Sequence, residues 1–133
     1  MLELKSETQN ARVPVTVIRI TGDIDSSTYS LFQTHVDEQV AQGARYILLD
    51  FREVKRISSA GLRVIHNLFN KLRDLHKDVN DDELRKKMST GAYKSPYLKL
   101  TNLAPHIADV FKLGGFDIYI AIIDDEKEAL ESF

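Results

Sequence analysis

The sequence contains no cysteine. Disulfide bonds, thiolate zinc sites and thiol nucleophiles are therefore excluded, and the absence is compatible with a cytoplasmic protein. A positive charge excess is also missing, because 18 lysines and arginines stand against 20 aspartates and glutamates, for a net charge of −2. Proteins that bind the phosphate backbone usually carry a strong basic excess, so we expect no nucleic acid among the partners of this chain.

Long apolar segments are missing as well. No window approaches the roughly eighteen uninterrupted apolar residues that a membrane-spanning helix needs. The N-terminal stretch MLELKSETQN has no apolar core of signal-peptide length, and its acidic residues argue against a transit peptide. We therefore expect a soluble, cytoplasmic protein that does not insert directly into a membrane.

The usual signatures of enzymes and metal sites are absent too. Neither GxGxxG, GxxxxGKS/T nor GxSxG occurs, and the histidines show no HxxxH or HExxH spacing. Asp78, Asn80 and Asp82 have the first spacings of a calcium-binding loop. However, Glu83 stands where that loop needs glycine, and Ser89 stands where it needs glutamate. We expect no metal, no cofactor and no catalytic residue in this chain.

Strand and helix patterns alternate along the sequence. Its 133 residues, 43% of them hydrophobic, suit one domain over residues 1–133. Apolar spacing predicts these elements in order: a short edge strand at Leu2 and Leu4, strand 13–21, helix 27–42, strand 44–51, helix 60–76, strand 97–101, helix 105–113, strand 118–123 and a short helix ending at Leu130. This order favours an α/β fold with parallel strand pairs, or a mixed-sheet α+β fold.

The predicted helices have apolar faces, and one charged insertion interrupts the pattern. Leu31, Leu75 and Leu113 are among the residues that we place on those faces. Residues 77–96, KDVNDDELRKKMSTGAYKSP, are rich in charge and contain Gly91 and Pro96. We expect this insertion to form a surface loop, with room for one helical turn at Asp82–Met88.

The segment KRISSAGLRVI, residues 55–65, separates a buried strand from a strongly amphipathic helix. On the residues alone, Ser58 or Ser59 is explained as a helix cap. In an α/β sheet, however, this loop lies at the carboxyl end of a strand, where such folds place their functional sites. Gly61 in the first helical turn costs stability relative to alanine, so packing or close approach of a partner is expected to favour it.

Three blocks of the sequence resemble the STAS domain family, and more narrowly the bacterial anti-sigma factor antagonists. In chain order the blocks are GDIDSSTYSLF, ARYILLDFREVKRISSAGLRVI and LTNLAPHIADVFKLGGFD. The resemblance implies a STAS-like fold, with a mixed sheet and helices packed mainly on one side. Aligning Gly61 and Leu62 with the family's Gly-Leu pair places Ser59 at the phosphorylated serine, with Ser58 as the second candidate.

The family also implies a mechanism, called partner switching. The unphosphorylated antagonist binds an anti-sigma factor that is also a serine kinase, and it is released when the kinase phosphorylates its serine. A PP2C-type phosphatase resets the cycle. ATP and magnesium are bound by the kinase, so the antagonist itself is not an enzyme and holds no cofactor.

The resemblance further implies which residues contact the partner. The candidates flank the acceptor serine in the sequence or lie in the turn before the first predicted helix: Asp23, Asp25, Ser58, Ala60, Gly61 and Arg63. Turn and cap formation is an equal explanation for the two aspartates. Arg63, with Arg56 or Lys55, is expected to compensate the phosphate charge.

Two other functions stay open on the sequence. One is a STAS module of a different signalling complex or an accessory subunit of a transporter; the other is a small enzyme using Asp23, Asp25 and His66. The insertion at 77–96 is longer than the connection usual in the family, and long connections are often functional or disordered.

Overall fold

In the computed structural model, which describes residues 2–91 and 93–133, five strands form one sheet with the order β1-β2-β3-β4-β5. Ala92, inside the expected insertion, lies outside the described residues, as does Met1. The elements are, in chain order, β1 (Glu3–Asn10), β2 (Pro14–Thr21), α1 (Tyr29–Ala41), β3 (Ile47–Glu53), α2 (Ser59–Leu75), α3 (Asp81–Ser89), β4 (Leu98–Thr101), α4 (Pro105–Leu113), the 3-10 helix η1 (Phe116–Ile118), β5 (Ala121–Ile123) and α5 (Glu126–Glu131).

The sheet is mixed, as the sequence predicted. β1 pairs antiparallel with β2, whereas β2, β3, β4 and β5 run parallel to their neighbours. The parallel order requires crossovers, and the helices between the strands supply them. Residues Ile47–Phe51 of β3 are buried on both faces, which confirms the prediction for the strand at 44–51.

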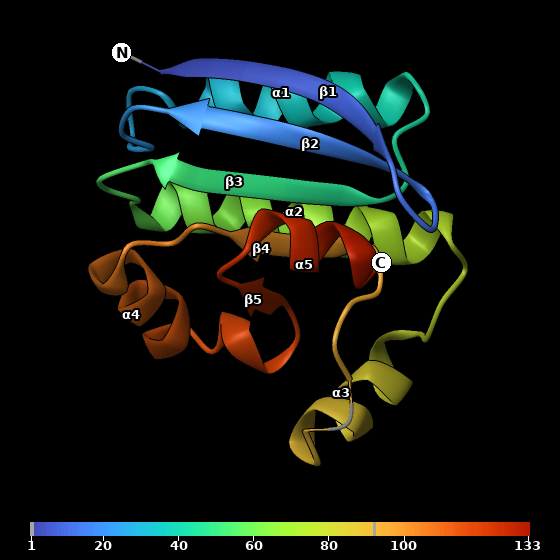
Figure 1. The fold of residues 1–133 in the computed structure, drawn as a ribbon. Helices are drawn as coiled ribbons and strands as arrows, with labels where there is room; N and C mark the ends of the chain where they lie inside the picture. The colour runs from blue at the N-terminus through green and yellow to red at the C-terminus, as the bar shows by residue number, and fades with distance from the viewer. Residues whose placement is uncertain (1, 92) are drawn as a thin grey trace.

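Helices cover the two faces of the sheet unequally. Figure 1 shows α1 and α2 behind the sheet and the short α5 in front of it. The larger core lies on the α1 and α2 side and contains Phe32, Phe69 and Phe111. A smaller cluster, with Val17 and Ala129, lies beneath α5. This arrangement confirms the predicted α/β fold with helices mainly on one side.

Two predicted segments are more ordered than the sequence suggested. The edge strand expected at Leu2 and Leu4 extends to Asn10 and pairs with the whole of β2. The insertion expected as a surface loop contains α3, a nine-residue helix that replaces the single turn. The Asn80 side chain caps this helix by accepting a hydrogen bond from the Glu83 N–H at 2.9 Å. Acidic residues in its first turn and lysines in its last turn complement the helix dipole.

Other details of the prediction were wrong. Only Ala121–Ile123 of the predicted strand 118–123 pair with β4, because η1 occupies the chain up to Ile118. Three leucines placed on buried helix faces are exposed, to 51% for Leu31, 42% for Leu75 and 90% for Leu113. Leu113 is the last residue of α4, after which Gly114 and Gly115 lead the chain into η1.

His35 of α1 should make stability depend on pH. Its ring contacts the Ser6 hydroxyl, and partial burial lowers the pKa of His35 from its ordinary value of 6.5. Below that pH the unfolded chain takes up a proton more readily than the folded one, so this contribution is complete above about pH 6.5 and is lost as the pH falls. We predict that His35→Gln flattens the decline in the free energy of unfolding between about pH 7.5 and pH 5.5.

Urea denaturation at the two pH values measures this effect. Thr34→Gln, at an exposed position of the same helix, is the control and should keep the wild-type slope. Equal slopes for wild type and His35→Gln would contradict the assignment.

Candidate functional site

The loop between β3 and α2 gives its two serines different roles. Ser58 is the N-cap of α2, and its Oγ accepts a long hydrogen bond of 3.5 Å from the Gly61 N–H. Ser59 is the first residue of the helix and is exposed. Within residues 2–91 and 93–133, the Ser59 hydroxyl has no hydrogen-bond partner. Capping thus accounts for Ser58, and it gives no such role to the Ser59 hydroxyl.

Backbone hydrogen bonds join this loop to the turn after β2. The Ile24 N–H donates to the Arg56 carbonyl at 3.0 Å, and the Ser58 N–H donates to the Ile24 carbonyl at 2.8 Å. Ile24 and Ile57 therefore form a parallel bridge beyond the ends of the strands. The bridge brings the turn that contains Asp23 and Asp25 beside the serines.

Asp23 and Asp25 are used differently within that turn. Asp25 Oδ1 accepts hydrogen bonds from the Ser27 and Thr28 N–H groups at 2.8 and 3.1 Å, and also from the Ser27 hydroxyl. These bonds, that of the Ser27 hydroxyl foremost, lower the pKa of Asp25. Asp23 contributes only its carbonyl oxygen to the turn, accepting from the Thr28 hydroxyl at 2.8 Å. Asp25 thus shapes the turn, whereas the Asp23 carboxylate makes no hydrogen bond to another described residue.

Gly61 is required by close packing beneath the site. It is buried, and a Cβ added there would lie 2.6 Å from Ile24 Cγ2 and 2.8 Å from Ile57 Cγ1. Real contacts of this kind are not shorter than about 3 Å, so a side chain would push α2 away from the bridge. Of the two reasons expected for this glycine, packing is therefore present in the structure.

A hollow opens beside Ser59, between α2 and η1. Its volume is about 400 Å³, and we call it the Ser59 hollow. Its lining consists of Ser59, Leu62, Arg63, His66, Gly114, Phe116 and Tyr119. Ala60, next to Ser59, is half-buried, whereas Arg63 is exposed one turn further along the helix. The predicted residues Ser59 and Arg63 therefore meet at one surface.

Sequence reasoning missed the apolar part of this surface. Leu113 and Ile118, exposed to 90% and 45%, flank Gly114 and Phe116 of the Ser59 hollow. Leu113 follows Val110 by three residues, and that step wrongly suggested a buried position. The Gly114-Gly115 pair was the available signal, because it ends the helix directly after Leu113 and prevents further packing.

His66 does not join the aspartates as a small catalytic site would require. Its Nδ1 lies 3.1 Å from the Tyr119 hydroxyl, and its Nε2 lies 3.2 Å from the Asn70 amide. Burial raises the pKa of Tyr119 to about 12, so that hydroxyl stays protonated. With Asp25 committed to its turn, the three groups form no acid–base constellation.

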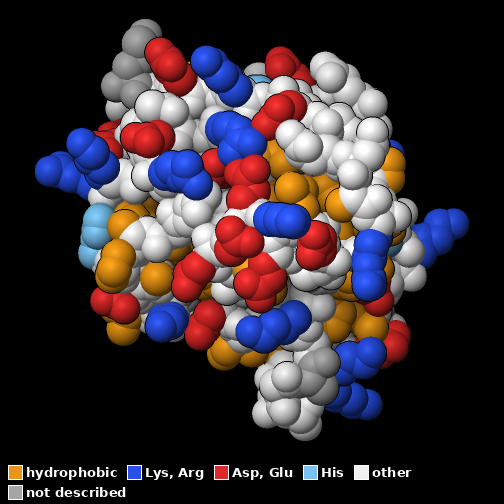
Figure 2. Space-filling model, in the orientation of Figure 1, with side chains coloured by type: hydrophobic (Ala, Val, Ile, Leu, Met, Phe, Trp, Pro, Cys, Tyr) orange, Lys and Arg blue, Asp and Glu red, His pale blue; other side chains and the backbone are white. Residues whose placement is uncertain are grey.

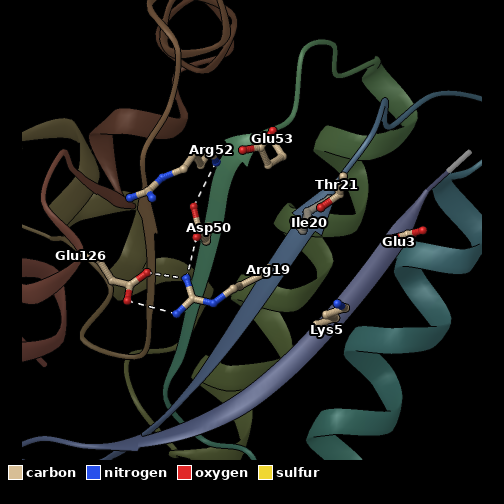
Figure 3. A pocket seen from close by; sticks show the side chains of 9 residues that line it. All are labelled: Glu3, Lys5, Arg19, Ile20, Thr21, Asp50, Arg52, Glu53 and Glu126. Carbon is tan, nitrogen blue, oxygen red and sulfur yellow. Dashed lines mark hydrogen bonds and ion pairs between the residues drawn. The ribbon is translucent and has the colours of Figure 1, made fainter.

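A larger hollow, of about 530 Å³, lies on the α5 side of the sheet (Figure 3). At its centre Arg19 is bonded to Asp50 and Glu126 of the lining, and also to Glu7, at 2.6 to 2.7 Å. These partners raise the pKa of Arg19 above its ordinary value. Figure 2 shows acidic and basic side chains interspersed over this face. We interpret this cluster as the attachment of α5 to the sheet.

Neither a metal site nor a membrane span is found in the described part of the chain. No three of its histidines, aspartates and glutamates are grouped so that they could hold a metal ion. The residues with calcium-loop spacing have other roles, since Asn80 caps α3 and Asp78 accepts from the Tyr93 hydroxyl at 3.0 Å. None of the described helices is both long and apolar enough to cross a bilayer.

Comparison with known proteins gives consistent matches. The STAS domain model matches residues 6–79. BtrV of Bordetella bronchiseptica, which is named an anti-sigma factor antagonist, is 25% identical over 114 residues, covering 86% of this chain and 82% of its own.

Solved structures share the fold. A crystal structure of a protein from Thermotoga maritima, also named an anti-sigma factor antagonist, superposes with a TM-score of 0.72 at 21% identity, covering 96% of this chain and 92% of that one. The Bacillus cell fate determinant SpoIIAA in its phosphorylated form superposes with a TM-score of 0.63 at 18% identity, with 97% of both chains covered.

The packing of Gly61 against the bridge can be tested directly. We predict that Gly61→Ala lowers the free energy of unfolding by about 1–2 kcal/mol, since overpacking costs about 1–3 kcal/mol and the gain in helix propensity returns up to about 1 kcal/mol. Chemical denaturation measures the change. Asn67→Ala, at an exposed position of the same helix, should cause no loss. A stabilised Gly61→Ala variant would show that the glycine is not needed for packing.

Proposed function

The chain belongs to the STAS domain family, whose model matches more than half of it, and from this premise we propose that it is an anti-sigma factor antagonist controlled by phosphorylation of Ser59. In its unphosphorylated form it binds an anti-sigma factor that is also a serine kinase. Phosphorylation releases it, and a PP2C-type phosphatase restores the binding form. The chain is a regulator and not an enzyme, in agreement with the names of its relatives.

The observation that carries this proposal is the exposed hydroxyl of Ser59 at the start of α2, which bonds to none of the residues that the structure describes. A kinase can reach it without unfolding any element of the protein. Ser58 lies one residue away but is half-buried and caps the helix, so it is the weaker acceptor. The phosphorylated form of the similar SpoIIAA protein supports the proposal that members of this fold accept a phosphoryl group.

The reaction transfers the γ-phosphoryl group of ATP to Ser59 Oγ, which loses its proton as the new P–O bond forms and ADP leaves. The kinase supplies ATP and magnesium. Hydrolysis of the phosphoserine by the phosphatase returns the hydroxyl and inorganic phosphate. This chain contributes the accessible acceptor and the surface on which the kinase docks.

The folded domain should tolerate the phosphate. At pH 7 a phosphoserine carries about −1.5 to −2 charges. At the first position of α2 these charges meet free backbone N–H groups and the positive end of the helix dipole. Arg63, one turn along the helix and lining the same hollow, provides a further cation.

The same phosphate should be unfavourable in a complex. The Ser59 hollow is largely apolar, so a docked partner would have to desolvate a dianion against Leu62, Phe116 and Tyr119. A loss of about 2.8 kcal/mol would weaken binding about 100-fold, which is enough to redistribute partners. The switch is therefore an effect on the interface, and the fold stays as it is.

Variants of Ser59 test this function. We predict that Ser59→Ala binds the anti-sigma factor kinases encoded in the same genome as tightly as wild type does and is not phosphorylated. Ser59→Asp should bind at least about tenfold more weakly, since a carboxylate brings part of the phosphate charge. Isothermal titration with ADP-bound kinase measures affinity, and mass spectrometry after incubation with ATP locates the phosphate.

The control is Thr34→Asp, which adds the same charge at an exposed position of α1 and should bind as wild type. Thermal unfolding of the phosphorylated protein should stay within a few degrees of the unmodified form, because the phosphate sits at a helix N-terminus. Phosphate on another residue only, or equal affinity of Ser59→Ala and Ser59→Asp, would refute the switch.

The two aspartates of the turn should respond differently to substitution. We predict that Asp23→Asn weakens binding to the kinase but leaves stability unchanged, because its carboxylate has no part in the turn. Asp25→Ala should lower the free energy of unfolding by about 1 kcal/mol, since the turn loses the bonds to Ser27 and Thr28. Denaturation and titration of both variants separate the two roles; the reverse pattern would contradict the assignment.

A further inference from the structure

The insertion helix α3 is held against α2 by a buried arginine. Arg73 is 5% exposed, and its guanidinium donates to the Val79 carbonyl, the Asn70 side chain and the Asp81 carboxylate at 2.8 to 2.9 Å. Leu84 of α3 packs into the main core on the same side. The helix is therefore fixed to the body of the protein, although it comes from a charged insertion and projects below the sheet in Figure 1.

A second hollow, of about 300 Å³, lies between α2 and α3, and we call it the α3 hollow. Its residues from α3 are Asp81, Leu84, Arg85 and Met88. His66 lines both this hollow and the Ser59 hollow. The two hollows therefore adjoin at His66 along the outer side of α2 from Ser59 to Asn70, with η1 beside one and α3 beside the other, and we call them together the groove. Its length is about 16 Å at the rise of an α-helix.

The groove combines apolar surface with surplus positive charge. Arg63 lines the Ser59 hollow, in which no carboxylate takes part. In the α3 hollow, the Asp81 carboxylate is already paired with Arg73, so it does not neutralise the second cation of this hollow, Arg85. Arg85 approaches Asp82 only to 3.8 Å, and both side chains are at least 80% exposed, so that pair holds it weakly. A complementary ligand carries carboxylates at both ends and apolar side chains between them.

We propose that this groove binds one acidic, apolar segment of the anti-sigma factor, and that α3 selects the partner through Arg85. The inference rests on the proposed function and extends it: Ser59 decides whether the partner binds, and the insertion decides which partner binds. A segment of three helical turns, or of about five extended residues, spans the distance from Ser59 to α3. Its carboxylates would face Arg63 and Arg85, while its apolar residues cover Phe116 and Met88.

A charge reversal with a matched neighbour tests the proposal. The probe is the purified anti-sigma factor kinase that phosphorylates Ser59, bound to ADP so that no phosphate is transferred during titration. We expect Arg85→Glu to weaken binding about tenfold at low salt, with a smaller loss at high salt because screening reduces the charge effect. In phosphorylation assays its KM should rise while kcat is unchanged, because α3 does not touch the reacting atoms.

Lys86→Glu is the control, since it makes the same charge change in the next residue of α3 but outside the groove. It should bind within about twofold of wild type. Equal stability of the two variants in thermal unfolding excludes a general effect on the helix. Arg85→Ala provides a second variant and should give an intermediate loss.

The outcomes separate the two proposals. If Ser59→Asp weakens binding but Arg85→Glu behaves like Lys86→Glu, the switch stands and the role of α3 is refuted. If the wild-type chain binds no anti-sigma factor kinase, both proposals fail together. Loss of affinity in Arg85→Glu that is matched by Lys86→Glu also overturns the groove, because charge alone would then explain it.

Discussion

The backbone bridge between Ile24 and Ile57 is the constraint on which the site depends. Two loops that follow different strands are joined by hydrogen bonds of 2.8 and 3.0 Å, and α2 begins directly on top of them. The absence of a side chain at Gly61 lets the helix approach the two isoleucines. These hydrogen bonds and packing contacts are buried. The position of Ser59 is therefore fixed by the interior of the protein and does not depend on the conformation of a surface loop.

This construction explains how two adjacent serines can serve different purposes. The one that turns inward completes the hydrogen bonding of the helix N-terminus, where the first N–H groups have no partner within the helix. The next one lies on the outer surface of the first turn. In the proposed switch, a charged group added there lies at the exposed, positive end of the helix dipole, so its energetic cost falls on the complex and not on the domain. A binding switch of this kind needs no second conformation of the protein.

Sequence patterns predicted the fold well where burial of a strand or of a helix face produces a clear apolar pattern. The apolar run at Ile47–Leu49 indicated a central strand, and the regular spacing from Leu62 to Leu72 indicated α2. The polar strand β1 was underestimated because its order comes from pairing with β2 along eight residues, which its own side chains do not reveal. The bridge at Ile24 could not be predicted from a local pattern either, because it pairs backbone groups that are far apart in the sequence.

The candidate site was predicted in part for the same reason. Ser59 and Gly61 belong to one short motif, so their proximity follows from chain order and the family resemblance. The apolar wall at η1 depends on contacts between distant segments, such as the hydrogen bond from the Ser95 N–H to the Tyr119 carbonyl at 2.8 Å. The position of α3 depends on the contacts of Arg73 with Val79 and Asp81, six and eight residues away, which apolar spacing does not reveal. A charged segment with little apolar content gave no reason to expect a fixed helix. The buried Arg73 guanidinium holds this helix in place by donating to three acceptors through its two terminal nitrogens, while its Nε has no partner among the described residues.

The separation of Ser59 from α3 along α2 has a physical consequence for the proposed regulation. The phosphate acts at the N-terminus, where the local field is positive and the surface is apolar, whereas α3 lies about three turns away. At physiological ionic strength that distance is about twice the Debye length, so the phosphate charge is largely screened at Arg85. If both proposals hold, changes in α3 alter the choice of partner while the effect of phosphorylation at Ser59 stays nearly constant.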